Sequence, residues 1–480
     1  MSLYKSSDIA LLNDNINKIT EQIARKKLEI FEPTKTERDK VMNIILDFIK
    51  DNKRKVYGGY ALNELIKDKK PQDAIYKDYD TPDIDFYSPD PINDIINLCD
   101  KLFKAGLKPV LGKEALHKDT YSIFINYTLY CDISYVPKNI YHKMPFKEIN
   151  YINYIHPHFM LIDYLRMIAD PLVSYWRIEK AFKRLYLLNN LYPLPHVKNN
   201  IKTPKPDDNI NYALNIILDY LKTKSSCVVI GLYAFNHYLE SSGVLKQKTK
   251  TNFNLVNVFY YEFISTNYKS DVLELLDMLK LKFQSDSITY IEYYNFFQFT
   301  GYFTNIYYEK NLIATIYHNN NKCLPYHIIK NLDNSKITIG SFPLLLCFIL
   351  INIMRIRANN DDTYKDMFYG IASHLVEARN LFFIKNNKNI FSDTIFKDFI
   401  IECIGFTQMP DREQRLLLEE RKKNNKKYMF KYDPETDTKI IPNYFFQNSS
   451  GNMINKKKNL KLTDYVGSDE EPEDDEKNDN

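Results

Sequence analysis

The thirteen residues "YDTPDIDFYSPDP" (79–91) decide how the first part of this chain folds. The run "DIDFYS" alternates like a β-strand, and it places Asp83 and Asp85 two residues apart. On a strand, residues i and i+2 point to the same face, about 6.6 Å from each other. Two carboxylates at that spacing repel each other, and burial adds the loss of their hydration. The pattern therefore predicts either a cation bound between them or a solvent-exposed face.

Two further motifs flank this strand. Upstream, "VYGGYALNELI" (56–66) predicts a short strand, a turn at Gly58 and Gly59, and a helix. Such a turn presents backbone N–H groups and the positive end of a helix to phosphate oxygens. Downstream, "TLYCDISY" (128–135) carries Asp132 in a stretch that alternates like one long strand or a hairpin. Three carboxylates on neighbouring strands can hold two magnesium ions, an arrangement that supports in-line nucleotidyl transfer.

The second half of the chain repeats the order of these motifs. The stretch "VIGLYAFNHYL" (229–239) aligns with 56–66 at a constant offset of 173, and matches its Val, Gly, Tyr, Ala and Asn. Further along, "YYEFIS" (260–265) aligns with "DIDFYS", and "NLIATIYH" (311–318) aligns with "TLYCDISY". This conserved order predicts an internal duplication.

The second copy has lost the residues that would bind a metal. Tyr260 and Glu262 stand in place of the first two aspartates, Thr315 in place of the third, and Leu232 in place of the second glycine. One remaining carboxylate cannot hold two ions and a triphosphate. We therefore expect the second copy to act as a scaffold or as an RNA-binding surface.

Taken together, the "GG" turn, the "DIDF" strand and the "CDIS" strand resemble the signature of the DNA polymerase beta-like nucleotidyltransferase superfamily. Within it, the chain resembles the poly(A) polymerase catalytic subunit of poxviruses and other large DNA viruses. The resemblance implies an α+β fold. Its parts would be a polymerase beta-like nucleotidyltransferase domain, a second, degenerate nucleotidyltransferase-like domain, N-terminal helices and a disordered acidic C-terminal tail.

The resemblance also implies roles for the site residues. Asp83, Asp85 and Asp132 would be catalytic ligands for Mg²⁺ or Mn²⁺, with Asp85 bridging both ions and Asp132 helping to activate the incoming 3′-hydroxyl. The reaction would be template-independent transfer of AMP from ATP to an RNA 3′ end, with release of pyrophosphate. Gly58 and Gly59 would bind the nucleotide, although many relatives carry serine at the second of these positions.

A basic segment follows the first copy. Arg177, Lys180, Lys183 and Arg184 fall at i, i+3, i+6 and i+7, which is one face of a helix. Relatives bring cationic side chains to the nucleotide at this point, so Arg177 and Lys180 are candidate nucleotide-binding residues. The other two are expected to be solvated, and Trp176, the only tryptophan, is expected in the core.

Composition and the resemblance together predict five parts. The stretch "EERKKNNKKYMFKY" (419–432), within the fourth of them, is expected to be an RNA-binding patch or a solvated helix end. The parts are an N-terminal helical segment (1–34), the catalytic domain (35–197), the degenerate domain (205–400), a basic C-terminal extension (401–463) and the acidic tail (464–480).

The thiols and the apolar runs predict an intracellular, reducing location without a membrane. Six cysteines include no CxxC, and no two lie closer than 24 residues, so neither a zinc site nor a disulfide framework is expected. The longest apolar run, "FPLLLCFILINIM" (342–354), is too short to span a bilayer and predicts a buried helix. By resemblance, the location would be the host cytoplasm or the virion.

Two other functions fit the same residues. A nucleotidyltransferase with another acceptor, either oligoadenylate-forming or small-molecule-modifying, would need the same aspartates. The chain's size and its degenerate second copy disfavour the small antibiotic-modifying kind. A non-catalytic RNA-binding scaffold is the other alternative, and the intact aspartates count against it. Poxvirus relatives use a separate processivity subunit, so such a partner and a homodimer are both open here.

The charge layout generates a prediction about the tail. Residues 464–480 hold nine acidic side chains and one lysine, a balance of −8, which leaves +12 on the first 463 residues. The affinity of a protein for a homopolymeric RNA comes from contacts to its phosphates and from stacking on its bases. The acidic tail of this chain would therefore weaken RNA binding by repelling the phosphates. Removing 464–480 should tighten RNA binding modestly at low salt, measured as RNA affinity against salt concentration. If the full-length and the truncated chain bound RNA with equal affinity at low salt, the tail would have no electrostatic effect on RNA binding.

Overall fold

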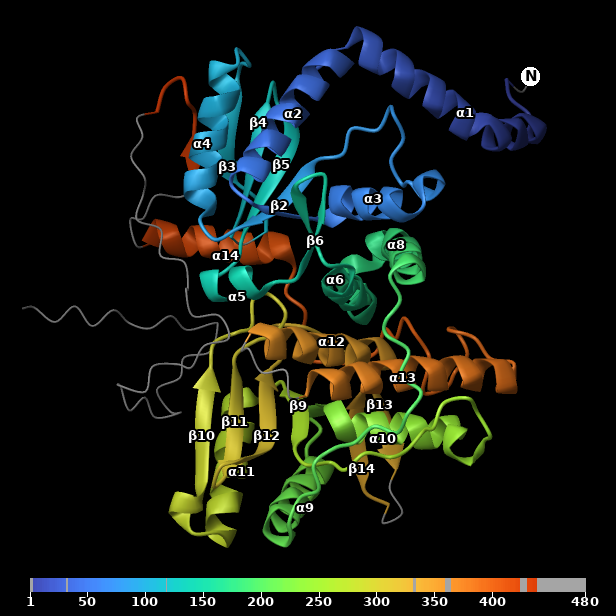
Figure 1. Cartoon of the computed structure of the whole chain (residues 1–480), viewed down its shortest axis with the longest axis vertical. Coiled ribbons are helices and arrows are strands. Elements are labelled where there is room, and N and C mark those ends of the chain that lie inside the picture. Colours follow the sequence, from blue (N-terminus) through green and yellow to red (C-terminus); the bar gives the residue numbers. More distant parts are fainter. Residues whose placement is uncertain are drawn as a thin grey trace, which may run out of the picture. The chain divides into compact units, whose positions relative to one another are not determined.

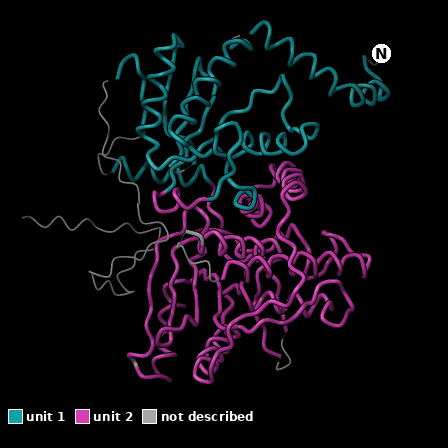
Figure 2. The backbone as a smooth tube through the Cα atoms, in the orientation of Figure 1, with its two compact units in different colours: residues 1–136, 145–160, 410–445 teal, residues 137–144, 161–409, 446–480 magenta. Residues whose placement is uncertain are grey.

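The computed structural model describes residues 3–31, 33–117, 119–330, 334–358, 364–423 and 430–437. The chain divides into two compact units (Figure 2). The first comprises residues 1–136, 145–160 and 410–445, and the second residues 137–144, 161–409 and 446–480. Each unit carries one mixed β-sheet with helices packed on it, so the predicted α+β class is confirmed. The five predicted domain boundaries stay a prediction.

Two helices open the first unit. Helix α1 (Ser6–Ile30) buries none of its residues. Helix α2 (Lys35–Asp51) begins with a capping box, in which Thr34 accepts from the Glu37 amide and the Glu37 carboxylate accepts from the Thr34 amide. Its buried face, with Val41, Ile45, Phe48 and Ile49, packs against the sheet and against α4 (Pro91–Lys104).

The sheet of the first unit has the strand order β16-β3-β4-β5-β2-β1-β7-β6, and Figure 1 labels β2 to β6 of these strands. Strand β2 lies between an antiparallel neighbour, β1, and a parallel neighbour, β5. Strands β4 and β5 form a hairpin, which decides between the two forms that the sequence left open. The bounds are β1 (Lys55–Tyr57), β2 (Ile84–Ser88), β3 (Val110–Glu114), β4 (Thr120–Ile125), β5 (Thr128–Tyr135), β6 (Phe146–Ile149), β7 (Ile152–Ile155) and β16 (Lys431–Tyr432).

The sheet of the second unit has the order β10-β11-β12-β9-β8-β14-β13-β15. Its bounds are β8 (Cys227–Ile230), β9 (Tyr261–Ser265), β10 (Ile288–Tyr293), β11 (Phe303–Tyr308), β12 (Asn311–His318), β13 (Leu324–Lys330), β14 (Lys336–Gly340) and β15 (Cys403–Ile404). The other α-helices are α3 (Gly58–Lys69), α5 (Lys138–Lys143), α6 (Pro157–Ala169), α7 (Pro171–Ser174), α8 (Ile178–Leu191), α9 (Asp208–Thr223), α10 (Gly231–Ser242), α11 (Tyr268–Lys282), α12 (Phe342–Ala358), α13 (Lys365–Asn386) and α14 (Pro410–Lys423).

The two sheets share one topology. Replacing β1 to β7 by β8 to β14 converts the first strand order into the second, apart from one added strand in each. The added strands lie at opposite edges, β16 beside β3 and β15 beside β13. The register agrees as well, because Asp85 pairs with Asp132 in the first sheet and Glu262 with Thr315 in the second. The structure therefore contains the predicted duplication.

The apolar run at 342–354 forms α12, whose residues are largely buried as predicted. It packs against α13 and α10 in the second unit. Among the described residues, no helix is long and apolar enough to cross a bilayer.

One cysteine pair departs from the expected reduced state. Cys323 and Cys403 form a disulfide in the second unit. The antiparallel pairing of Leu324 with Ile404 brings their neighbours together, with the two cysteine Cα atoms 5.4 Å apart, a normal distance for a disulfide. A sequence separation of 80 residues gave no sign of this pairing. The expectation of reduced thiols is therefore wrong for this pair, while Cys99, Cys131, Cys227 and Cys347 are free and buried.

Two further expectations change. Trp176 is 64% exposed, so the expected core position is wrong; its ring lies under the guanidinium of Arg177, 4.1 Å from it. In the stretch 419–432, Phe430 and Tyr432 are buried rather than available to RNA, because β16 pairs with the edge of β3. Residues 424–429 and the acidic tail at 464–480 lie outside the described residues.

Candidate active site

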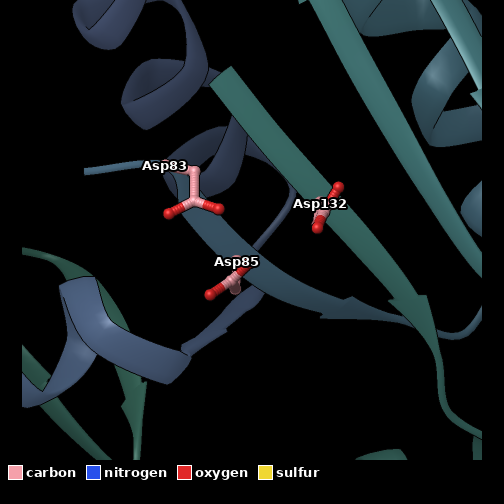
Figure 3. Close-up of side chains that lie close together, drawn as sticks. All are labelled: Asp83, Asp85 and Asp132. Carbon is pink, nitrogen blue, oxygen red and sulfur yellow. The ribbon is translucent and has the colours of Figure 1, made fainter. Parts of the chain in front are cut away.

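Three carboxylates from two adjacent strands meet in the first unit. Asp85 on β2 is paired in register with Asp132 on β5, and Asp83 immediately precedes β2 on the same face as Asp85. Each side chain offers an oxygen, and these oxygens lie within 4.8 Å of one another (Figure 3). All three side chains are partly exposed, so the group is open to a ligand from solution. The structure thus brings together the three aspartates that the sequence singled out.

A serine on the neighbouring strand orients one of them. Ser122 lies opposite Asp132 in the β4–β5 hairpin, and its hydroxyl donates to Asp132 Oδ1 at 2.5 Å. Burial raises the pKa of Asp132, the Ser122 hydrogen bond opposes that shift, and the negative charge of Asp83 adds to it. Sequence reasoning missed Ser122, because its place beside Asp132 depends on the hairpin register.

The glycine turn comes within contact distance of the same group. Gly58 pairs with no β2 residue itself, but its neighbour Tyr57 is in register with Asp85. The backbone of Gly58 has φ +72°, and a Cβ there would lie 2.2 Å from Asp85 Oδ2. Only glycine fits this turn without displacing the carboxylate. Because α3 begins at Gly58, its N-terminal N–H groups lie beside Asp85, and Gly59 is buried in the first turn of the helix.

The asparagine of the repeated motif has a structural role in both units. Asn63 Oδ1 accepts from the backbone amides of Ile75 and Tyr76, both at 3.0 Å, and so fixes the loop that leads to β2. Asn236 exchanges two hydrogen bonds with the backbone of Val256 in the second unit. Asn63 is 5% exposed, and its amide oxygen is engaged by these two backbone amides.

The corresponding place in the second unit is filled by protein. Gly231 has φ +68°, and a Cβ there would lie 2.6 Å from Glu262 Oε2, which repeats the geometry of the first unit. Glu262 is 1% exposed. Its Oε1 accepts from the Tyr317 hydroxyl at 3.1 Å and from Asn352 Nδ2 at 2.9 Å. Its Oε2 accepts from the Tyr260 hydroxyl at 3.2 Å and from Asn352 Nδ2 at 3.1 Å, so both carboxylate oxygens are already hydrogen-bonded within the protein.

In the second unit, an arginine of the chain itself supplies a positive charge near Glu262. Arg355 on α12 donates to the Tyr317 hydroxyl at 2.7 Å and is electrostatically coupled to Glu262. Thr315 donates to Asn305 at 2.9 Å, in the same cross-strand position that Asp132 and Ser122 occupy in the first unit. Over the described residues, Asp83, Asp85 and Asp132 form the one group of three or more potential metal ligands.

Arg177 and Lys180 lie in the second unit, Arg177 at the end of the 3₁₀ turn η2 (Tyr175–Arg177) and Lys180 on α8. Their assignment to the nucleotide stays a prediction.

Comparisons with known proteins identify the family. Residues 43–174 match the model described as "Poly(A) polymerase catalytic subunit", and residues 210–464 match "APMV, Putative poly(A) polymerase, catalytic subunit, C-terminal". The "Putative poly(A) polymerase catalytic subunit" of Acanthamoeba polyphaga mimivirus is 38% identical over 486 residues, covering 94% of this chain and 83% of the relative. The chain belongs to the poly(A) polymerase catalytic subunit family.

A solved structure agrees with this assignment over both units. The crystal structure of the Megavirus polyadenylate synthase is 39% identical, with a TM-score of 0.89, covering 96% of this chain and 94% of that one. A protein of the same description from African swine fever virus (isolate Pig/Kenya/KEN-50/1950) is 27% identical over 181 residues, 36% of this chain and 37% of the relative. The resemblance drawn from three short motifs is confirmed, and with it the enzyme class, a polynucleotide adenylyltransferase.

The contact between Ser122 and Asp132 can be tested by substitution. Ser122→Ala removes a hydrogen bond to a carboxylate, a loss of about 1–2 kcal/mol, so kcat should fall roughly 5- to 30-fold. The acidic limb of the pH–rate profile should move to higher pH, because the pKa of Asp132 then rises further. Ser122→Thr, which keeps the hydroxyl, should restore both. An unchanged acidic limb in Ser122→Ala would contradict the orienting role.

The raised pKa of Asp132 generates a second prediction. The pKa of Asp132 is higher in the folded protein than in the unfolded chain. Such a carboxyl group contributes fully to the stability of the fold when the pH is below its pKa in the unfolded chain. That contribution is lost as the pH rises through its pKa in the folded protein. In metal-free protein, Asp132→Asn should therefore raise Tm by about 2–4 °C near pH 8, and by less near pH 5.

Thermal denaturation at both pH values, in EDTA and then in Mg²⁺, measures this effect. Magnesium should raise Tm of the wild type and have a smaller effect on Asp132→Asn, because the variant lacks one ligand. A variant that is less stable than the wild type at pH 8 without metal would show that burial of the charge is not the controlling factor.

Proposed function

We propose that Asp83, Asp85 and Asp132 hold two divalent cations and so catalyse the transfer of AMP from ATP to the 3′-hydroxyl of RNA. The observation that carries the proposal is the convergence of three carboxylates in the first unit, at the place that protein side chains fill in the second. Carboxylate oxygens at this spacing suit the hard ions Mg²⁺ and Mn²⁺. Bound there, the ions would supply charge stabilisation to the attacking and leaving oxygens.

The chain's own residues have distinct tasks in this proposal. Asp85, which is flanked by the other two carboxylates, would contribute to holding the cations together with Asp83 and Asp132. Asp132 lies beside the incoming 3′-hydroxyl and helps to remove its proton as the oxygen attacks the α-phosphorus of ATP. The bond between the α-phosphorus and the bridging oxygen then breaks, so that pyrophosphate leaves and AMP is joined to the RNA. Ser122 keeps Asp132 in one orientation through this step.

The phosphates are bound by backbone rather than by a serine side chain. The amides of Gly58 and Gly59 stand at the N-terminus of α3, where the helix dipole favours negative charge. Because this chain has glycine at the position where many relatives have serine, the backbone N–H groups would bind the phosphates, and the metal ions would supply further positive charge. Arg177 and Lys180 are proposed to neutralise further charge on the nucleotide.

The two units provide a matched pair of variants to test this proposal. Asp85→Asn should lower extension of an RNA primer with ATP and Mg²⁺ by roughly 10³-fold or more, because metal-based charge stabilisation is lost. Glu262→Gln alters the corresponding position of the second unit and should leave the rate within about twofold of wild type, since no metal is proposed there.

The assay also separates the proposed acceptor from its rivals. Each nucleoside triphosphate is supplied in turn with an RNA primer, without primer, and with small-molecule acceptors. Extension of the primer by ATP alone is the expected result. Near wild-type extension by Asp85→Asn would refute the metal assignment, and product formed only without RNA would favour an oligoadenylate-forming enzyme.

A further inference from the structure

One tyrosine of the first unit connects the glycine turn to the strands that carry the carboxylates. Tyr57 is the last residue of β1 and directly precedes Gly58, where α3 begins. It is in register with Asp85 on β2. Residues directly opposite each other on antiparallel strands project from the same face of the sheet. The side chain of Tyr57 therefore lies on the face that carries the carboxylates.

The ring of Tyr57 packs on the strand that carries Asp85. It stacks on the ring of Tyr87, with the ring centroids 3.9 Å apart and 6° between the ring planes. Tyr87 lies two residues after Asp85 on β2, hence on the same face, and it is 1% exposed. Contacts between aromatic rings stabilise a pair of strands beyond the burial of their surface. The stack therefore holds β1 against β2 next to Asp85.

The hydroxyl of Tyr57 reaches across β2 to the strand that carries Asp132. It is hydrogen-bonded to the Ser134 hydroxyl on β5 at 2.7 Å, and that hydroxyl is hydrogen-bonded to Thr120 on β4 at 3.0 Å. Strand β2 lies between β1 and β5 in the sheet, so this contact spans a whole strand. Ser134 lies two residues after Asp132 and therefore on the same face. The three hydroxyls thus join β1, β5 and β4 beside the carboxylates.

The second unit has different chemistry at the corresponding positions. By strand register, Ile230 takes the place of Tyr57, and Ile264 takes the place of its stacking partner. Both isoleucines are buried, and their side chains have no hydrogen-bond donor or acceptor. Tyr317 takes the place of the serine, and its hydroxyl is bonded to the buried glutamate of that unit. The connection made by Tyr57 therefore occurs in the unit that holds the three carboxylates and is replaced in the other.

We propose that Tyr57 is a positioning residue, which fixes the spacing of Asp85 and Asp132 and thereby sets the affinity of the first unit for divalent cations. This role rests on the proposed function, because it requires that the carboxylates hold cations. Tyr57 touches neither the cations nor the substrates in it, and acts only through the positions of the strands.

The repulsion between the carboxylates is the reason that such a role is needed. Oxygens of Asp83, Asp85 and Asp132 lie within 4.8 Å of one another, and without a cation their negative charges favour separation of the strands. A cation binds more tightly when its ligands are already in place, because binding then costs less ordering of the protein. A side chain that ties β1 to both β2 and β5 supplies that order before the cation arrives.

Binding of Mn²⁺ to the full-length protein, measured by electron paramagnetic resonance without nucleotide or RNA, tests this role. Tyr57→Phe keeps the stacked ring and removes the hydrogen bond to Ser134, so the affinity for Mn²⁺ should fall about 3- to 10-fold. Ser134→Ala should weaken binding similarly, and the double variant should be little weaker than Ser134→Ala, because both changes remove the same bond. In RNA extension, the Mg²⁺ concentration for half-maximal rate should rise by the same factor, and excess Mg²⁺ should recover most of the rate.

Tyr432→Phe is the matched control in the same unit. The Tyr432 hydroxyl donates to Asp100 Oδ1 at 2.7 Å, and its strand, β16, is separated from β5 by β3 and β4. Both tyrosine-to-phenylalanine variants should lower Tm by similar amounts, whereas Tyr432→Phe should keep the wild-type affinity for Mn²⁺. Equal losses of Mn²⁺ affinity in the two variants would contradict the role, because general stability would then control metal binding.

Asp85→Asn separates a failure of this role from a failure of the proposed function. If Asp85→Asn loses Mn²⁺ binding while Tyr57→Phe binds Mn²⁺ as tightly as the wild type, the positioning role is wrong and the metal site stands. If neither variant weakens binding, the metal site itself is refuted, and the role of Tyr57 with it. If Tyr57→Phe does not fold, Ser134→Ala decides between the same outcomes, because it removes the same hydrogen bond from the other side.

Discussion

The architecture of the first unit depends on holding three carboxylates within 4.8 Å of one another. Their mutual repulsion would separate them in a flexible chain, so each is fixed by its backbone. Parallel pairing of β2 with β5 sets Asp85 against Asp132, and the hydrogen bond from Ser122 fixes the second of these. Gly58 allows the helix that follows β1 to start at the edge of the group. The fold thereby concentrates negative charge that a divalent cation can balance.

The second unit has the same framework but does not hold three carboxylates together at this place. Gly231 and Glu262 keep the positions of Gly58 and Asp85, yet Glu262 is bound by Tyr317 and Asn352, with Arg355 beside them. The Tyr317 hydroxyl links the carboxylate of Glu262 to the guanidinium of Arg355, so these buried polar groups satisfy one another within the protein. The glycine turn is therefore a property of the fold that both units share, while the side chains that face it differ between them.

The sequence was sufficient for the class of fold, the duplication and the three aspartates, since each of these follows from local periodicity and a repeated order of motifs. It failed where the answer depends on the register between paired strands. Ser122 is an ordinary serine until the hairpin places it opposite Asp132, and Cys323 meets Cys403 only because β13 pairs with β15. Trp176 is exposed because it lies in a short turn between helices, a position that hydrophobicity alone cannot indicate.

The disulfide makes a covalent ring of the chain between Cys323 and Cys403. That ring includes α12, which provides Arg355 and Asn352, and α13, which packs on it. A single break in the backbone anywhere inside the ring would leave both halves of the molecule joined through sulfur. The segment that carries α12 and α13 is thus attached to the second sheet twice, once through the peptide chain and once through the disulfide between Cys323 and Cys403.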